Sequence, residues 1–192
     1  VRSLGLRNHA RSLQYWHDLL AGYNTKAVIP FDADMGPEES GGSYEEYLDV
    51  DSSVMTAINS LCRSEGITPN TVVELAWGAL LQIYNNTDDV VFVKVVSGRS
   101  GGDMDVTDVV GLFINSVPVR CSVTGDTSVV EALRTMHRQA AETNLHDYCS
   151  LAEIQAESGA GSELFQSIIG FQNFPEGAII SMPLHANGAS KS

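Results

Sequence analysis

The sequence is poor in basic residues and has no long hydrophobic run. Eleven lysines and arginines stand against 24 aspartates and glutamates, so the formal net charge is −13. A strongly negative protein repels phosphate backbones, and we therefore expect no nucleic acid partner. No apolar run approaches the roughly eighteen residues of a membrane span, and no basic segment followed by an apolar one opens the chain. We expect no membrane partner.

Cysteine is scarce as well. Cys62, Cys121 and Cys149 are odd in number and widely spaced, and no CxxC pair is present. This pattern argues against a disulfide framework and against a zinc site. Histidines at HxxxH or HExxH spacing are also missing, so no metal site is predicted. A reducing, cytoplasmic location fits these features best.

The size of the chain favours one folded unit. With 192 residues and 43% hydrophobic content, the sequence can form one good-sized core. It begins with valine, and its last residues, "PLHANGASKS", show no apolar periodicity. We expect a fragment of a longer polypeptide, in which residues 1–177 form the folded unit and residues 178–192 are a poorly structured tail or an artificial end.

Hydrophobic periodicity predicts helices that alternate with strands. The strand expected at 89–96, "DVVFVKVV", is a continuous β-branched run, typical of the centre of a sheet. Pro118 favours an edge or a strand end for the segment 110–120. The mixed order predicts an α/β sandwich with helices packed on a mixed sheet. The expected helices span 9–23, 52–67, 68–86 and 126–142, and the expected strands span 43–51, 89–96, 110–120 and 163–174.

Two segments resemble catalytic or phosphate-binding motifs only superficially. In "LHDYCSL", His146, Asp147 and Cys149 lie too close in sequence, because the members of a catalytic arrangement usually come from separate segments. The glycine-rich "SGRSGG" lacks the spacing of a phosphate loop and predicts a turn between strands. The other histidines are isolated, which favours surface or helix-flank positions: His9, His17, His137 and His185.

Asn115 is the more informative polar residue. It lies within the apolar segment "VGLFINSVPVR". A buried side-chain amide without a hydrogen bond costs about 1 to 3 kcal/mol, so this amide must have partners. Asn115 is therefore either a structural staple to a loop or a group that faces a polar ligand.

Five segments, in this order, resemble the C-terminal half of a condensation domain from a nonribosomal peptide synthetase. They are "LQYWHDLLAGY", "TPNTVVELAWGALLQIYNNTDDVVFVKVVSGRS", "VGLFINSVPVR", "SLAEIQ" and "LFQSIIGFQNFP". The similarity runs from about Ser12 to Pro175, nearly the whole chain. It implies one lobe of the chloramphenicol-acetyltransferase-like fold, a sandwich of a mixed β-sheet with packed helices.

The resemblance implies a role in natural product biosynthesis. In that family two lobes enclose a tunnel, into which the phosphopantetheine arms of two carrier proteins carry their thioesters. The reaction is peptide bond formation, an acyl transfer from the donor thioester to the acceptor amine. The implied partners are the N-terminal lobe of the same condensation domain and the upstream and downstream peptidyl carrier proteins. No cofactor is expected to bind directly, since phosphopantetheine is the substrate carrier.

The same resemblance limits the activity expected of this chain. The family's catalytic HHxxxDG motif belongs to the N-terminal lobe and is absent here, so we expect no catalytic residue and no activity of the isolated fragment. Asn115 and Ser116 match the family motif beside the tunnel, and its "FINS" form favours peptide bond formation over epimerisation or heterocyclisation. Ser97, Gly98 and Arg99 match a segment close to the channel.

Two alternative functions stay open at this point. The chain could be a non-catalytic module that binds a carrier protein or another subunit. It could also be a stand-alone acyltransferase that uses His146 as its base.

Overall fold

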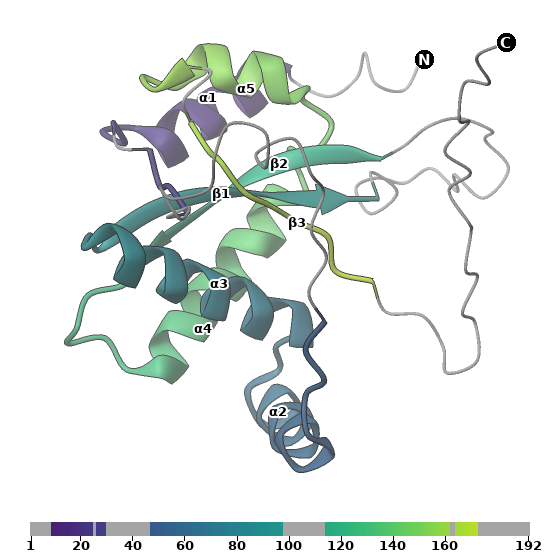
Figure 1. Ribbon diagram of the computed structural model, residues 1–192. Coiled ribbons are helices and arrows are strands. Elements are labelled where there is room, and N and C mark those ends of the chain that lie inside the picture. Colours follow the sequence, from purple (N-terminus) through teal and green to yellow (C-terminus); the bar gives the residue numbers. More distant parts are fainter. Residues whose placement is uncertain (1–8, 25, 30–46, 98–113, 162–163, 173–192) are drawn as a thin grey trace, which may run out of the picture.

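The computed structural model describes residues 9–24, 26–29, 47–97, 114–161 and 164–172. These ranges contain five helices and three strands (Figure 1). In chain order they are α1 (His9–Leu20), α2 (Ser52–Glu65), α3 (Pro69–Asn85), β1 (Asp89–Val96), β2 (Asn115–Ser122), α4 (Val129–Thr143), α5 (Leu151–Glu157) and β3 (Ile168–Ile169).

The described strands form one mixed sheet in the order β2-β1-β3. Strands β1 and β2 are antiparallel, with Phe92 opposite Val119, whereas β1 and β3 are parallel, with Val93 opposite Ile168. The central position predicted for the β-branched strand is confirmed. Pro118, which cannot donate a ladder hydrogen bond, lies on β2 at one edge of this described sheet.

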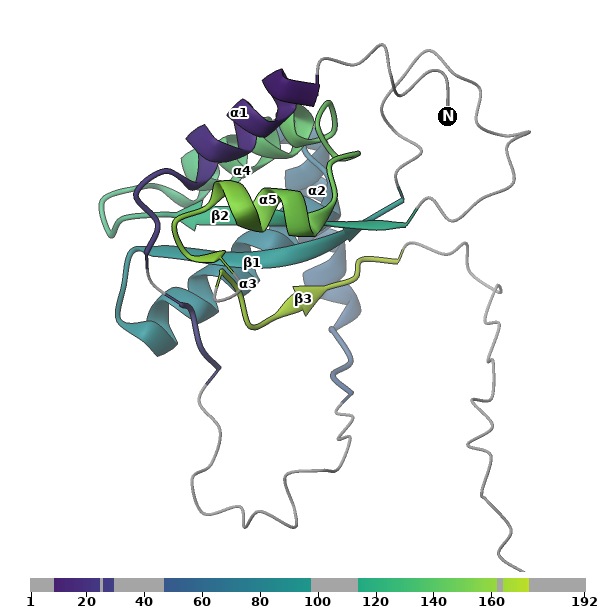
Figure 2. The same cartoon turned by 90° about the horizontal axis from the view of Figure 1, so that it is seen from above.

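Helices cover both faces of the sheet, as the two views show (Figure 1 and Figure 2). Helices α1 and α5 pack on one face, and α3 and α4 pack on the other, with α2 beyond α3. The first layer buries Trp16, Leu20 and Ile154 together with Val91 of β1. The second buries a cluster that includes Leu81, Val90, Phe92, Val119, Cys121, Leu133 and Met136. The predicted α/β sandwich is confirmed.

Local signals in the sequence set the ends of several helices. The side chain of Thr68 accepts a hydrogen bond from the backbone N–H of Thr71 at the start of α3, and Pro69 follows at the first helical position. Helices α4 and α5 both begin with a capping box, in which a serine and the glutamate three residues later satisfy each other's backbone N–H groups. The serines are Ser128 and Ser150.

Three predictions of secondary structure differ from the structure. Within the strand predicted at 43–51, the described residues 47–51 form no strand, and Tyr47 and Leu48 are 87% and 89% exposed. Within the strand predicted at 163–174, the described residues 164–172 form a strand at Ile168–Ile169 only, and residues 163, 173 and 174 lie outside the described residues. Helix α5 was not predicted, because a seven-residue helix with Ile154 as its buried side chain has too little periodicity. Residues 43–46, 110–113 and the expected tail at 178–192 lie outside the described residues.

Helix α3 approaches the sheet closely at Gly78. A methyl group at this position would lie 2.6 Å from both Cβ and Sγ of Cys121 on β2. Non-bonded carbon atoms normally stay about 3.5 to 4.0 Å apart, so no larger residue fits without a shift. Glu74 lies one turn earlier on the same side of the helix and is 1% exposed. The glycine thus allows Glu74 to reach the sheet.

Candidate functional site

Asn115 joins the start of β2 to the loop between α4 and α5. Its side-chain Nδ2 donates to the backbone oxygens of Asp147 and Cys149, each at 2.7 Å. Its Oδ1 accepts from the backbone N–H of Ser116 at 2.8 Å. Both N–H donors of the amide are therefore used by the loop, as the staple interpretation requires. The amide contributes to the site by fixing the backbone that carries Asp147.

The predicted site residues that the structure describes lie at one end of the sheet. Asn115 is opposite Val96 at the end of β1, and Ser116 is opposite Val95. Ser97 follows β1 directly and is exposed. Gly98 and Arg99, the remaining two predicted site residues, lie outside the described residues.

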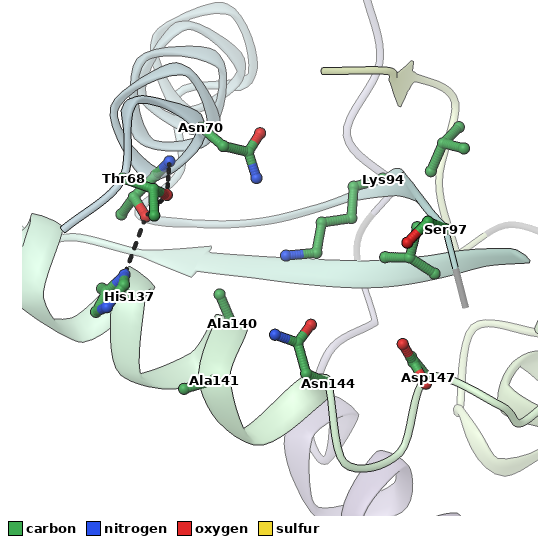
Figure 3. A pocket seen from close by; sticks show the side chains of 12 residues that line it. Thr68, Asn70, Lys94, Ser97, His137, Ala140, Ala141, Asn144 and Asp147 are labelled. Carbon is green, nitrogen blue, oxygen red and sulfur yellow. Dashed lines mark hydrogen bonds between the residues drawn. The ribbon is translucent and has the colours of Figure 1, made fainter. Parts of the chain in front are cut away.

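A pocket of about 240 Å³ opens beside this end of the sheet (Figure 3). It lies between the first turn of α3, the last residues of β1 and the C-terminal half of α4. Ser97 and Asp147 both line it, so the loop that Asn115 holds also forms part of the wall. Ser97 is the described predicted site residue that lines the pocket, where it lies near polar groups from other elements.

A buried ion pair lies at the pocket. The Lys94 ammonium is 3.0 Å from Oε1 of Glu74, and the two side chains are 8% and 1% exposed. Nδ2 of Asn70 donates to the same Oε1 at 2.7 Å, whereas Oε2 of Glu74 has no hydrogen-bond partner. In Figure 3 the Lys94 side chain extends into the space between Asn70 and Asn144. A charge this far from water is stabilised mainly by its partner.

Sequence reasoning did not identify this pair, although the sequence carried a signal for it. Lys94 interrupts the apolar run "DVVFVKVV", and Glu74 interrupts the apolar helix segment "TVVELAWG". Buried lysine and glutamate are rare unless they are paired. Each residue taken alone predicts a buried charge, and together they predict a contact between α3 and β1.

His146 takes part in a hydrogen-bonded cluster that joins α1 to the loop. Its Nδ1 lies 2.8 Å from Oγ of Ser12, and this hydroxyl also lies 2.7 Å from the hydroxyl of Tyr148. The imidazole stacks on the ring of Tyr15 at 4.4 Å. Burial lowers the pKa of His146. Although serine and histidine are paired, Ser12 is 3% exposed and is not accessible to a substrate, so the geometry assigns this cluster a structural role.

Cys149 is poorly suited to act as a nucleophile. Its side chain is fully buried, and burial raises the pKa of its thiol to about 11. Its sulfur lies 3.9 Å from Nδ1 of His9. A thiol with so high a pKa stays protonated at neutral pH, and the thiolate is the reactive form. The structure agrees with the argument from sequence against a Cys149 nucleophile.

Of the other histidines in the described ranges, His9 contacts both Glu153 and Cys149, whereas His137 and His17 have one hydrogen-bond contact each. His137 lines the pocket, and its Nδ1 lies 3.3 Å from Oγ1 of Thr71. Nδ1 of His17 lies 3.3 Å from the backbone oxygen of Glu157. In the described part of the chain, no three histidine, cysteine, aspartate or glutamate side chains form a group that could hold a metal ion. No helix there combines the length and hydropathy of a membrane span.

The comparison with protein families identifies the relationship of this chain. The profile of the condensation domain matches residues 3–187. The chain belongs to the condensation-domain family. Among curated proteins, it is 34% identical over 175 residues to bacitracin synthase 1 of Bacillus licheniformis and 32% identical over 177 residues to tyrocidine synthase 3 of Brevibacillus parabrevis. These matches cover 91% and 92% of the chain.

The condensation-domain relatives are much longer than this chain, which spans 3% of the length of each of these two synthases. Among solved structures, the first condensation domain of the CDA synthetase superimposes with a TM-score of 0.67 at 16% identity. That match covers 86% of this chain and 35% of the solved chain. The described elements therefore share the fold of about a third of a solved condensation-domain chain.

Proposed function

We propose that this chain is the C-terminal lobe of a condensation domain and forms one wall of its reaction tunnel. The single observation that carries the proposal is the family match over residues 3–187. It is supported by the mixed sheet with helices on both faces, and by a solved condensation-domain chain of which this chain matches about a third.

In the proposed reaction, the acceptor's amine nitrogen forms a bond to the carbonyl carbon of the donor thioester. The carbon–sulfur bond breaks, the amine loses a proton, and the donor's phosphopantetheine arm leaves as a thiol. The HHxxxDG motif is absent from this sequence, so the proposal assigns proton transfer to the other lobe. The upstream and downstream carrier proteins are the proposed partners.

In the proposed mechanism, the residues of this lobe position a loop and supply polar groups, and they transfer no proton. Asn115 fixes the backbone of Asp147 and Cys149, and thereby the loop beside the end of β1. Ser97 and Ser116 supply uncharged polar groups at the same end of the sheet. Uncharged groups suit a tunnel through which a neutral amine and a neutral thioester must pass.

The proposal is tested by comparing the isolated chain with a condensation domain that contains it. Each is incubated with a loaded donor and a loaded acceptor carrier protein, and dipeptidyl carrier is measured by mass spectrometry. We expect dipeptide from the two-lobed domain and none from the 192-residue chain. Robust turnover by the isolated chain, lost in His146→Ala, would instead establish a stand-alone acyltransferase. Carrier binding without dipeptide from the two-lobed domain would establish an interaction module.

A further inference from the structure

The pocket beside β1 has unused hydrogen-bonding capacity of both kinds. Lys94 carries three N–H donors, and Glu74 accepts one of them. Asn70 uses its Nδ2 on Glu74, which leaves its side-chain oxygen as an acceptor. Across the described ranges, the side chain of Asn144 has no hydrogen-bond partner. A ligand here would meet donors and acceptors together.

The charges around the pocket favour a neutral ligand. Lys94 and Glu74 form a pair whose net charge is zero, and Asp147 lies on the wall nearby. A ligand anion would approach the Asp147 carboxylate on the pocket wall, and a ligand cation would approach the ammonium of Lys94. Either ion would lose hydration on entering the pocket, and the Lys94–Glu74 pair offers no free opposite charge to compensate for that loss.

The size and shape of the pocket favour a small group. Its volume of about 240 Å³ is below the range of about 300 to 1,000 Å³ that is usual for drug-sized ligands. Ala140 and Ala141 contribute short side chains to one wall, and Val95 and Val96 contribute apolar surface near Ser97. A polar head with a few methylene groups matches this combination.

We propose that this pocket binds a neutral amide group. The amide oxygen accepts a hydrogen bond from Nζ of Lys94, and the amide N–H donates to the side-chain oxygen of Asn70 or Asn144. An amide is a neutral group that offers a strong acceptor and a donor on two atoms bonded to the same carbon. The proposal concerns this lobe alone and stands independently of peptide formation.

The test is a titration of the isotopically labelled 192-residue chain, followed by NMR. The probes are propionamide, N-methylacetamide, propionate and propylammonium. We expect at least one of the two amide probes to change the chemical shifts of the backbone N–H groups of residues 94–97 and of the Asn144 side-chain NH₂. These changes should saturate with probe concentration. The two ions, which have similar size, should produce no saturable shift at these positions.

The two amide probes distinguish a primary carboxamide ligand from a secondary amide ligand. Saturable binding of propionamide alone supports a primary carboxamide, such as the side chain of asparagine or glutamine. Binding of both amides supports a backbone-type secondary amide as well. The proposal is overturned if neither amide gives a saturable shift at the pocket of the folded chain, which leaves water as its occupant, or if the ions bind as tightly as the amides.

Two variants assign the binding to the named side chains. Asn144→Ala removes one pocket amide and should weaken binding about tenfold, the factor that one strong hydrogen bond supplies. The double variant Lys94→Met/Glu74→Met replaces the ion pair with apolar side chains of similar length and should abolish binding. Such replacements usually preserve folding, and circular dichroism checks this. Thr135→Ala, on the exposed side of α4, is the matched control and should bind like the original chain.

If the double variant does not fold, Asn144→Ala and the Lys94 signals together decide the question. Unchanged amide binding in folded Asn144→Ala, together with unchanged Lys94 signals on titration, overturns the assignment. Since no step measures peptide formation, failure here leaves the proposed function of the lobe intact.

Discussion

Arg120 holds Asp89 through a two-point contact. Its Nε and Nη2 lie 2.8 and 2.6 Å from Oδ1 and Oδ2 of the carboxylate. Its Nη1 donates to the backbone oxygens of Leu19 and Ala21, each at 2.9 Å. The last carbonyls of a helix have no partner within the helix. One side chain therefore joins β2 to β1 and also satisfies the end of α1.

Arg120→Lys should destabilise the fold although it keeps the charge. A lysine presents a point charge and cannot replace a planar fork that reaches a carboxylate and two carbonyls. We expect the free energy of unfolding, measured in urea, to fall by about 1 to 3 kcal/mol. Arg134→Lys is the control, because the Arg134 side chain is 60% exposed in its pair with Glu65. A control effect above about 1 kcal/mol, equal to that at Arg120, would contradict the argument.

The Lys94–Glu74 pair should show strong non-additivity. Lys94→Met leaves Glu74 as a buried charge without its partner and should lower the free energy of unfolding by about 3 to 5 kcal/mol. Lys94→Met/Glu74→Met should recover most of this loss or exceed the original stability. Urea unfolding of both single variants and the double variant gives the coupling energy. Additive losses would show that the two charges do not act as a pair.

Asn115→Ala should loosen the loop between α4 and α5. Two backbone carbonyls lose their donor, so we expect a loss of about 1 to 3 kcal/mol in unfolding free energy and faster hydrogen exchange at residues 146–150. Under the proposed function, peptide formation by the two-lobed domain should also fall. Ser116→Ala is the neighbouring control for stability. If an Asn115→Ala domain is less stable but turns over at the wild-type rate, Asn115 has a structural role only.

His146 should make stability depend on pH. Its pKa is lowered, first by burial and then by Arg11, while Glu142 acts in the opposite direction. The unfolded histidine, with a pKa of about 6.5, binds a proton before the folded one does. Stability is therefore complete above about pH 6.5 and falls as the pH drops toward the lowered folded value. Urea unfolding between about pH 7 and pH 5 measures this slope.

His146→Gln should reduce that slope, and His17→Gln is the matched control. The His17 ring contacts one backbone oxygen at the surface and lies outside the Ser12 cluster. An unchanged slope in His146→Gln would show that the dependence arises elsewhere.

Gly78→Ala should test the close approach of α3 to β2. The added methyl would meet Cys121 at 2.6 Å, and overpacking of this kind typically costs about 1 to 3 kcal/mol. Gly125→Ala is the control, because a methyl there meets nothing within 4 Å. Thermal unfolding of both variants measures the difference, and equal stability of the two would contradict the contact.

Local sequence signals predicted the parts of the fold that depend on neighbours along the chain. The continuous β-branched run identified β1 as the central strand, and Thr68 with Pro69 marked the start of α3. The predicted strand at 43–51 failed over residues 47–51 because alternation alone cannot show whether a partner strand exists. Helix α5 was missed because its capping box precedes only seven helical residues.

The site depended on contacts that are distant in sequence. Asn115 reaches carbonyls 32 and 34 residues further along the chain, so periodicity could not choose between a staple and a ligand contact. Lys94 finds its partner 20 residues earlier, on another element. The chemistry of each residue was visible in the sequence, whereas the partner that decides its role was supplied by the tertiary fold.

The close packing at Gly78 also constrains how this sequence can change over evolutionary time. Glu74 reaches Lys94 because a residue without a side chain stands one turn further along the same helix. A larger residue at position 78 would push α3 away from Cys121 on β2, and this shift would also draw Glu74 away from Lys94. Substitutions at positions 74, 78 and 94 are therefore coupled to one another through the close packing of α3 on β2.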